Sequence, residues 1–425
     1  MGGYAVVGLV VALVTTLVTP LCRLVAVRYG VVAQPDAQRR IHLVPTPQLG
    51  GVAMCVAVLV GLAVASFIPQ FKGVFGSSSE PLGIALAAVI ITAVGVVDDM
   101  IDVSPPAKLA GMVLAGTALY FLGVVMYYVR VPFLGILVLS PDLVPLLTVL
   151  WVLGMANAIN FIDGLDGLAA GIVAISSGVF FIYSDRLFKA GLLPGDNVGP
   201  LIAVITCGAC IGFLPWNFSP ARIFMGDAGA LLLGLLLAAS TMVVGGRADP
   251  ASRFSGQTYF FVAPLFIPFV ILAVPMFDTV LAIIRRTWRR SGVAIADRQH
   301  LHHRLLEMGH GPRRAVVILW SFTAIFSGLA LAPSFISARW PLIPLSIAFV
   351  VTLAVTLMHP DLRRARRARR AEGRLGAHPS QHPGEHRSAA AEHSPSVTAE
   401  FSANGRDSRE QRIETQPSSG VSSDS

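Results

Sequence analysis

The chain has 425 residues, of which 54% are hydrophobic and 13% are charged, and its mean hydropathy is +0.69. Soluble domains carry roughly 25% charged residues, so this composition excludes a soluble globular protein and indicates that much of the apolar surface faces lipid. The formal net charge of +8 is accompanied by no nucleic-acid-binding motif, and we therefore expect no nucleic-acid partner.

Eleven apolar segments are candidates for bilayer-spanning helices, each of which needs about 20 residues. They lie at 3–20, 50–69, 82–97, 109–128, 142–157, 167–184, 198–214, 228–245, 260–284, 315–333 and 340–358. The first has no charged segment before it, so we expect a retained span rather than a cleaved signal peptide. The sequence therefore predicts an all-α polytopic integral membrane protein with 11 transmembrane helices.

Basic residues indicate which side of the membrane each loop occupies. If the C-terminus is cytoplasmic, 19 arginines fall in the inner loops and flank, against seven Lys and Arg residues in the outer loops. Cytoplasmic loops are enriched in basic residues, so the N-terminus is predicted outside and the C-terminus inside. We expect residues 1–360 to form the transmembrane domain, and residues 361–425, basic and then of low complexity, to form a disordered cytoplasmic tail.

With this topology, the strongly polar segments all lie at the inner ends of the spans. They are residues 35–51, 97–102, 157–171, 217–229 and 297–305. Ionisable residues close to the membrane interior are costly and are usually functional. The sequence therefore predicts one functional site at the cytoplasmic face.

Adjacent carboxylates follow the third apolar segment directly. Asp98 and Asp99 would repel each other unless a cation or a proton intervened. A divalent metal would relieve this repulsion, whereas a solvated helix end is the simpler alternative.

The fifth predicted span leads into the sequence NAINFIDGLDGLAAG at 157–171. Steps of three residues place Asn157, Asn160 and Asp163 along one helical face, which Asp166 would join if the helix continued. The glycines among them permit a bend or the close approach of a phosphate. Packing of small residues would explain the glycines but not the acids.

Asp227 lies at the start of the eighth predicted span. An aspartate there is a common helix N-cap, and a helix N-terminus also favours phosphate. The two interpretations are compatible.

A cationic cluster lies between the ninth and tenth predicted spans. It contains His300, His302, His303, Arg298 and Arg304. Three histidines could bind zinc, but five basic residues in seven favour recognition of an anion. The grouping of carboxylates, amides and cations fits Mg²⁺-assisted handling of phosphates, and no Walker-type motif favours an ATPase.

Four motifs, in this order, carry a family resemblance: DDMID at 98–102, the stretch at 157–171, FMGD at 224–227 and HLHHRL at 300–305. Together they resemble the polyprenyl-phosphate N-acetylhexosamine-1-phosphate transferases (glycosyltransferase family 4). Within that family, the chain is most similar to the branch that makes undecaprenyl- or decaprenyl-diphosphate-N-acetylglucosamine.

The resemblance implies a reaction in which the phosphate of a polyprenyl phosphate attacks the β-phosphorus of a UDP-sugar and releases UMP. The HLHHRL sequence points to UDP-N-acetylglucosamine, because muramoyl-pentapeptide members carry a longer His run. UDP-MurNAc-pentapeptide, or another UDP-N-acetylhexosamine, is the alternative. The implied setting is the cytoplasmic face of the plasma membrane, at the first membrane step of a cell-envelope glycan.

The resemblance also implies roles for single residues. Asp98 resembles a base for the lipid phosphate, with Asp99 beside it to orient it or to assist the metal. The second pKa of a phosphate monoester is about 6, so Asp98 could serve a metal instead. Asp163 joins these two as a catalytic residue near the nucleotide. The implied ligands of Mg²⁺, or of Mn²⁺, are Asp227 and Asn160. The implied substrate-binding residues are Lys108, Asn157, Asp166, Asn217, His300, His302, His303 and Arg304.

Two other classes of protein are weighed against the transferase. A secondary transporter would place its polar residues near the bilayer midplane, often within inverted repeats, and neither feature is found in the sequence. A catalytically inactive scaffold would be expected to have lost acids from the site. The expected partners are the UDP-sugar, the polyprenyl phosphate and the bilayer, and a homodimer is compatible with the sequence.

Overall fold

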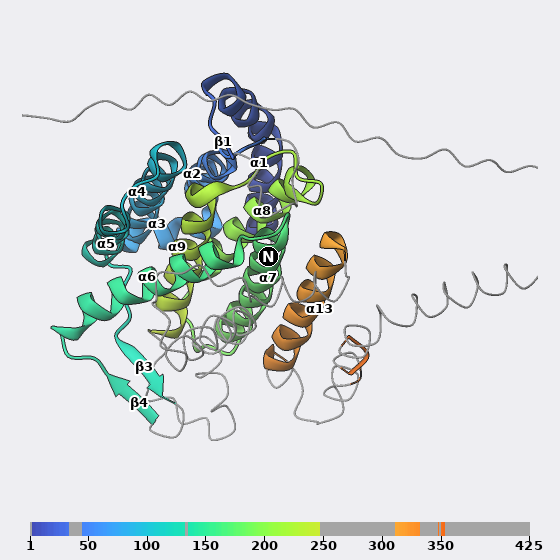
Figure 1. The fold of residues 1–425 in the computed structure, drawn as a ribbon. Helices are drawn as coiled ribbons and strands as arrows, with labels where there is room; N and C mark the ends of the chain where they lie inside the picture. The colour runs from blue at the N-terminus through green and yellow to red at the C-terminus, as the bar shows by residue number, and fades with distance from the viewer. Residues whose placement is uncertain are drawn as a thin grey trace, which may run out of the picture. The chain divides into compact units, whose positions relative to one another are not determined.

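The computed structural model of the chain describes residues 2–33, 45–131, 135–246, 311–331, 347 and 350–352. These residues are mostly helical (Figure 1). The long helices are α1 (Gly2–Tyr29), α2 (Gly50–Phe67), α4 (Glu80–Ile101), α5 (Pro105–Phe121), α6 (Leu143–Ile162), α7 (Leu168–Lys189), α8 (Gly199–Asn217), α9 (Gly226–Gly245) and α13 (Pro312–Leu331). The short elements are β1 (Val32–Ala33), β2 (Thr46–Pro47), η1 (Pro69–Phe71), α3 (Lys72–Ser77), β3 (Tyr128–Val131) and β4 (Gly135–Val138).

The prediction of a polytopic, helical membrane protein is confirmed. Seven helices in the described part of the chain, namely α1, α2, α4, α6, α7, α8 and α9, are long and apolar enough to cross a membrane. Helices α5 and α13 coincide with two further predicted spans. The predicted span at 260–284, most of that at 340–358 and the whole predicted tail at 361–425 lie outside the described residues. The number of eleven spans and the sides of the two termini therefore stay predictions.

Several helices run beyond their predicted spans, α1 to Tyr29 instead of residue 20, and one predicted span begins and ends too late. The segment expected at 109–128 forms α5 at Pro105–Phe121, because two prolines suit the first turn of a helix and the chain turns at Leu122–Gly123 before β3 begins. Lys108 therefore lies in the first turn of α5 instead of in the loop before it.

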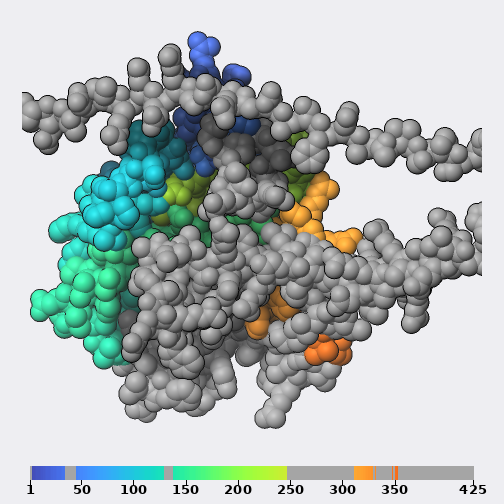
Figure 2. Space-filling model, in the orientation of Figure 1, coloured from blue at the N-terminus to red at the C-terminus, as the bar shows by residue number. Residues whose placement is uncertain are grey.

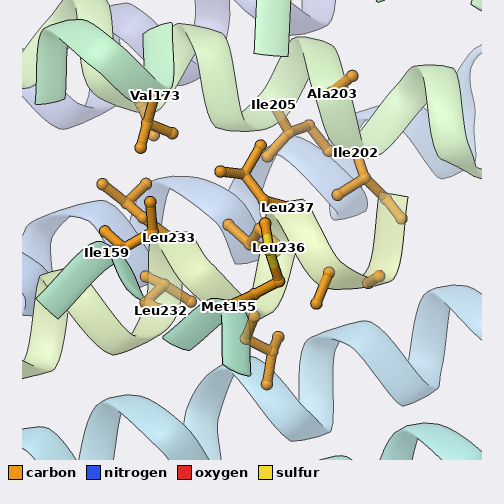
Figure 3. Packing of buried hydrophobic residues seen from close by; sticks show 14 of the residues in the cluster. Met155, Ile159, Val173, Ile202, Ala203, Ile205, Leu232, Leu233, Leu236 and Leu237 are labelled. Atoms are coloured by element: carbon orange, nitrogen blue, oxygen red, sulfur yellow. The ribbon is translucent and has the colours of Figure 1, made fainter. Parts of the chain in front are cut away.

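Helix α9 lies at the centre of the bundle, where it packs against α2, α4, α6 and α8. Every residue from Ala228 to Val244 is buried. Figure 3 shows leucines of α9 between side chains of its neighbours, among them Met155 and Ile159 of α6 and Ile202 and Ile205 of α8. A helix that is apolar on all sides is stable only when it is fully enclosed, so α9 provides a fixed reference for the site.

The outer helices keep one apolar face exposed. On α1, Leu9, Leu13, Leu17 and Leu21 are each more than half exposed and follow one another by four residues. On α5 and α6, which lie at the surface in the space-filling view (Figure 2), Phe121 and Leu146 are exposed as well. Exposed leucine stripes of this kind are expected to face lipid.

Two antiparallel hairpins connect helices at the ends of the bundle. In one of them β1 pairs with β2, and Pro47 of β2 accepts a hydrogen bond from Phe224, just before α9. In the other, β3 pairs with β4 in a register of Tyr128 opposite Val138. The Gly246 carbonyl, which follows the last residue of α9, accepts hydrogen bonds from the amides of Tyr127 and Tyr128. The central helix is thus attached to a hairpin at each end.

Candidate active site

Three helix ends bring the first group of predicted site residues together. The Lys108 ammonium, in the first turn of α5, donates to Asp98 Oδ2 over 2.8 Å and also to Asp227 Oδ2 at the start of α9. The three side chains are 21%, 12% and 29% exposed in that order, so they are partly buried but open to the surface. Of the two adjacent acids, Asp98 therefore has the Lys108 ammonium as its counter-charge.

The turn between α4 and α5 aims Lys108 at Asp98. Helix α4 ends with Asp102 in the left-handed conformation (φ 54°), whose amide bonds to the Asp98 carbonyl at 3.0 Å. The next amide, of Val103, donates to Asp98 Oδ1 at 2.9 Å. Ser104 then caps the start of α5 with its carbonyl, which accepts from the Lys108 amide at 3.1 Å. This short turn therefore holds the Asp98 carboxylate between the Val103 amide and the Lys108 ammonium.

Asp99 points to a different partner from Asp98. Its Oδ1 accepts the amide N–H of Asp227 at 2.9 Å, and its Oδ2 accepts that of Ala228 at 3.2 Å. The first N–H groups of a helix have no partner within their own helix, so a carboxylate from α4 completes the first turn of α9.

Close backbone contacts hold the same turn from two sides. The amides of Gly50 and Gly51, on α2, donate to the carbonyls of Phe224 and Met225 at 3.0 and 2.9 Å. On α4, a Cβ added at Gly95 would lie 2.6 Å from the Asp227 carbonyl carbon, closer than real Cβ atoms approach. The backbone before and within the first turn of α9 is therefore held by α2 and α4 together.

Asn160 and Asp163 reach the site from the end of α6. The Asn160 amide is next to the Asp227 carboxylate, and its buried Nδ2 has no hydrogen-bond partner among the described residues. Asp163 follows the last residue of the helix. Burial, reinforced by the carboxylates of Asp227, Asp99 and Asp166, raises the pKa of Asp163 to about 7. The site thus concentrates negative charge, which favours binding of a cation.

Other predicted site residues make structural contacts. Asn157 donates from Nδ2 to the Leu153 carbonyl of its own helix at 2.8 Å. Asp166 is in a turn, because α6 ends at Ile162 and does not continue to it, and its Oδ2 accepts the Ala221 amide at 3.0 Å. Asn217 is 2% exposed; its Oδ1 accepts the Gly167 amide and its Nδ2 donates to the Ile223 carbonyl, both at 3.0 Å. Asp166 and Asn217 therefore join the 163–167 turn to the 217–224 loop.

Replacing Asn217 with alanine is expected to lower the free energy of unfolding by about 1–3 kcal/mol, because it leaves the buried Gly167 amide and Ile223 carbonyl without partners. The fall in melting temperature in detergent measures this cost. Asn217→Asp places a buried carboxylate against the Ile223 carbonyl oxygen, so its melting temperature at neutral pH should fall at least as far. Equal melting temperatures for alanine and wild type would contradict the structural role.

The cationic cluster of His300, His302, His303 and Arg304 lies outside the described residues. The helix that follows it, α13, is attached to the same loop: Arg313 Nε donates to the Ser219 carbonyl at 2.7 Å, and Trp320 lies 5.6 Å, centroid to centroid, from Phe218. The first described residues after the cluster therefore lie beside the loop that leads into α9.

The site also depends on residues that the motifs did not single out. Gly51, Gly95 and Gly226 let α2, α4 and the Asp99 carboxylate approach the start of α9. Two of them were visible in the sequence as parts of LGG at 49–51 and MGD at 225–227. Their role as contact points, however, depends on which helices are neighbours. The described residues contain no ready-made group of three or more His, Cys, Asp or Glu side chains able to hold a metal.

Comparison with known proteins identifies the class. Residues 81–245 match the family described as glycosyl transferase family 4. The decaprenyl-phosphate N-acetylglucosaminephosphotransferase of Mycolicibacterium smegmatis is 36% identical over 369 residues, which cover 85% of this chain and 89% of that protein. The chain therefore belongs to the polyprenyl-phosphate N-acetylhexosamine-1-phosphate transferase family, as its motifs predicted.

Two further relatives extend the comparison, one named for N-acetylglucosamine and one for the muramoyl-pentapeptide. The probable undecaprenyl-phosphate N-acetylglucosaminyl 1-phosphate transferase of Bacillus subtilis is 33% identical over 326 residues, covering 76% of this chain and 83% of its own length. The phospho-N-acetylmuramoyl-pentapeptide-transferase of Mycolicibacterium smegmatis is 28% identical over 318 residues, covering 68% and 83%. Similarity is thus higher to these two N-acetylglucosamine enzymes than to this muramoyl enzyme.

Proposed function

We propose that this protein transfers N-acetylglucosamine 1-phosphate from UDP-N-acetylglucosamine to a polyprenyl phosphate, giving polyprenyl-diphosphate-N-acetylglucosamine and UMP. The observation that carries the proposal is the Asp98–Lys108–Asp227 cluster at the ends of three membrane helices. The family supports it, because relatives with 36% and 33% identity are named for this type of transfer to a polyprenyl phosphate.

The cluster suits a displacement at phosphorus. Such a reaction needs the two substrates held in line and the charge of the diphosphate neutralised. In our proposal Lys108 supplies a fixed positive charge to the phosphates, and Asp98 orients the ammonium and receives the lipid phosphate beside it. Whether Asp98 takes a proton from that phosphate or serves a metal stays open, since the phosphate is largely ionised at neutral pH.

The residues present fit a magnesium ion. Mg²⁺ is commonly held by one or two carboxylates and completed by substrate phosphates, so the lack of a three-acid group among the described residues is no obstacle. Asp227 and Asn160 would hold it: the buried Nδ2 of Asn160 has no hydrogen-bond partner among the described residues, and turning the amide over presents Oδ1 as a ligand. When bound, Mg²⁺, or Mn²⁺ in its place, would neutralise charge on the diphosphate.

The topology belongs to the same proposal. We place eleven spans in the plasma membrane, with the N-terminus outside, the C-terminus in the cytoplasm and the site on the cytoplasmic face. That arrangement gives the site access to a water-soluble nucleotide sugar and to a lipid in the bilayer. We assign His300, His302, His303 and Arg304 to the nucleotide sugar's phosphates. Asp163 would be near the nucleotide, and the oligomeric state stays a prediction.

The muramoyl-pentapeptide substrate is the second candidate donor, because a relative of that name is 28% identical. Purified protein in detergent, supplied with a polyprenyl phosphate, Mg²⁺ and labelled UDP-N-acetylglucosamine or UDP-MurNAc-pentapeptide in parallel, separates the two donors. We expect label in the lipid phase only from UDP-N-acetylglucosamine, and none after EDTA treatment. Transfer only from the muramoyl donor would favour the second candidate, and transfer from neither would contradict the proposal.

Asp227→Asn is expected to abolish transfer without changing insertion into the membrane, because the variant keeps the side-chain shape but loses the charge beside Lys108. Initial rates in the assay above, with western blotting of the membrane fraction, measure both. Near-normal turnover in this variant would remove Asp227 from the mechanism.

A further inference from the structure

The two adjacent aspartates at the end of α4 have different partners. Asp98 contacts the Lys108 ammonium and the Val103 amide. Both oxygens of Asp99 accept hydrogen bonds from backbone N–H groups of α9, those of Asp227 and Ala228. A carboxylate bonded in this way satisfies N–H groups that the helix leaves free, and its charge complements the positive end of the helix dipole.

Helix α9 lacks a cap of its own. Met225 holds the N-cap position and makes no side-chain capping hydrogen bond, and Gly226 has no side chain. The capping role that Ser, Thr, Asp or Asn usually plays within the same helix is therefore taken by Asp99 from a neighbouring helix. Asp227, the second residue of α9, is one of the two residues whose amides are held.

Gly226 makes room for this contact. Its φ is +66°, which side chains rarely adopt, and a Cβ there would lie 2.8 Å from Asp99 Cγ. A side chain at residue 226 would therefore exclude the Asp99 carboxylate from its present position.

We infer that Asp99 is a positioning residue, which fixes the first turn of α9 and thereby aims the Asp227 carboxylate, rather than a group that touches the substrate. The inference rests on the proposed function, in which Asp227 acts at the diphosphate. The two adjacent residues of α4 therefore hold different groups: Asp98 contacts the Lys108 ammonium of α5, and Asp99 fixes the Asp227 amide of α9. The pair therefore sets the distance between the two carboxylates that share the Lys108 ammonium.

A double-mutant cycle tests this inference. Asp99→Ala removes the cap, and Gly226→Ala disturbs it from the other side without removing a carboxylate. Each is expected to lower kcat by about 100-fold, the effect of a displacement of about 1 Å in a catalytic group, with KM for UDP-N-acetylglucosamine changing much less. The double variant is expected to lose less than the product of the two single losses, because the clash with the Asp99 carboxylate is gone while the clash with the Gln48 carbonyl oxygen remains.

Asp99→Asn distinguishes positioning from direct chemistry. Asparagine keeps one acceptor oxygen for an α9 amide, so the variant should be clearly more active than Asp99→Ala. A proton acceptor or metal ligand would leave the asparagine variant as inactive as the alanine variant. Asp142→Ala is the matched control: Asp142 holds the N-cap position of α6 without making a side-chain capping hydrogen bond, and its replacement should leave kcat unchanged.

Size-exclusion profiles and melting temperatures in detergent establish which variants fold. If Asp99→Ala does not fold, Asp99→Ser, which also removes the carboxylate, replaces it in the cycle with the same criterion. The inference would be overturned if the two losses in kcat multiply in the double variant, or if Asp99→Asn is as inactive as Asp99→Ala. In either case, transfer by the wild-type protein would leave the proposed function standing. A wild-type protein that transfers no sugar phosphate would overturn both.

Discussion

Replacing Lys108 with alanine is expected to lower the rate of N-acetylglucosamine 1-phosphate transfer by about 1,000-fold, the usual cost of removing one fixed electrostatic group from a site of group transfer. The ammonium bridges Asp98 and Asp227, and without it two carboxylates from α4 and α9 face each other with no counter-charge. The initial rate of label transfer into the lipid phase measures the loss.

Two further substitutions make the Lys108 result specific. Lys108→Arg restores the charge but replaces a compact ammonium with a planar guanidinium, so its rate should lie between those of alanine and wild type. Lys189→Ala is the control: Lys189 is 56% exposed and pairs with Asp185 one helical turn away, and such surface pairs contribute little. A Lys108→Ala variant within threefold of wild type, or a similar loss in Lys189→Ala, would contradict the role of the bridge.

Replacing Gly95 with alanine is expected to reduce both stability and activity. The new Cβ would meet backbone atoms of Asp227 and Ala228, which cannot turn aside as a flexible side chain would, so α4 and α9 must separate. Overpacking of this kind costs about 1–3 kcal/mol in unfolding free energy. A shift of about 1 Å between Asp98 and Asp227 would lower turnover by about 100-fold.

Gly154→Ala provides the matched control for Gly95→Ala. Gly154 lies within α6, and a Cβ there has no atom within 4 Å. Alanine is a better helix former than glycine by about 1 kcal/mol, so this variant should melt at the same or a higher temperature and retain its turnover. If both glycine variants lose activity alike, the close α4–α9 contact is not the cause.

Some features of the candidate site could be predicted from the sequence, and others could not. The pattern of acids at span ends indicated Asp98 and Asp227, the family resemblance added Lys108, and the structure places their side chains in contact. Asp98 and Asp99 are indistinguishable in the sequence, being the same residue type at adjacent positions. Only the structure shows that Asp98 contacts Lys108 and that Asp99 contacts the backbone of α9.

Asp166 and Asn217 show what the motifs leave open. The resemblance implies contact with the substrate, and that role stays a prediction. The structure adds that their side chains bond to backbone groups across two loops. A side chain's partner depends on what the fold brings within about 3 Å, and motif spacing does not contain that information.

The sequence by itself determined that this protein is a helical membrane protein with a phosphate-handling site at the helix ends. The length of an apolar segment and the cost of placing its ionised groups in lipid are properties of that segment alone. These properties, and the order of the motifs along the chain, can be read from the sequence without knowledge of the fold. The tertiary structure decided which helix is central, which carboxylate caps α9 and which glycines allow the backbones to touch. These features arise from packing between segments distant in the chain, where differences of a few tenths of an ångström determine which contacts form.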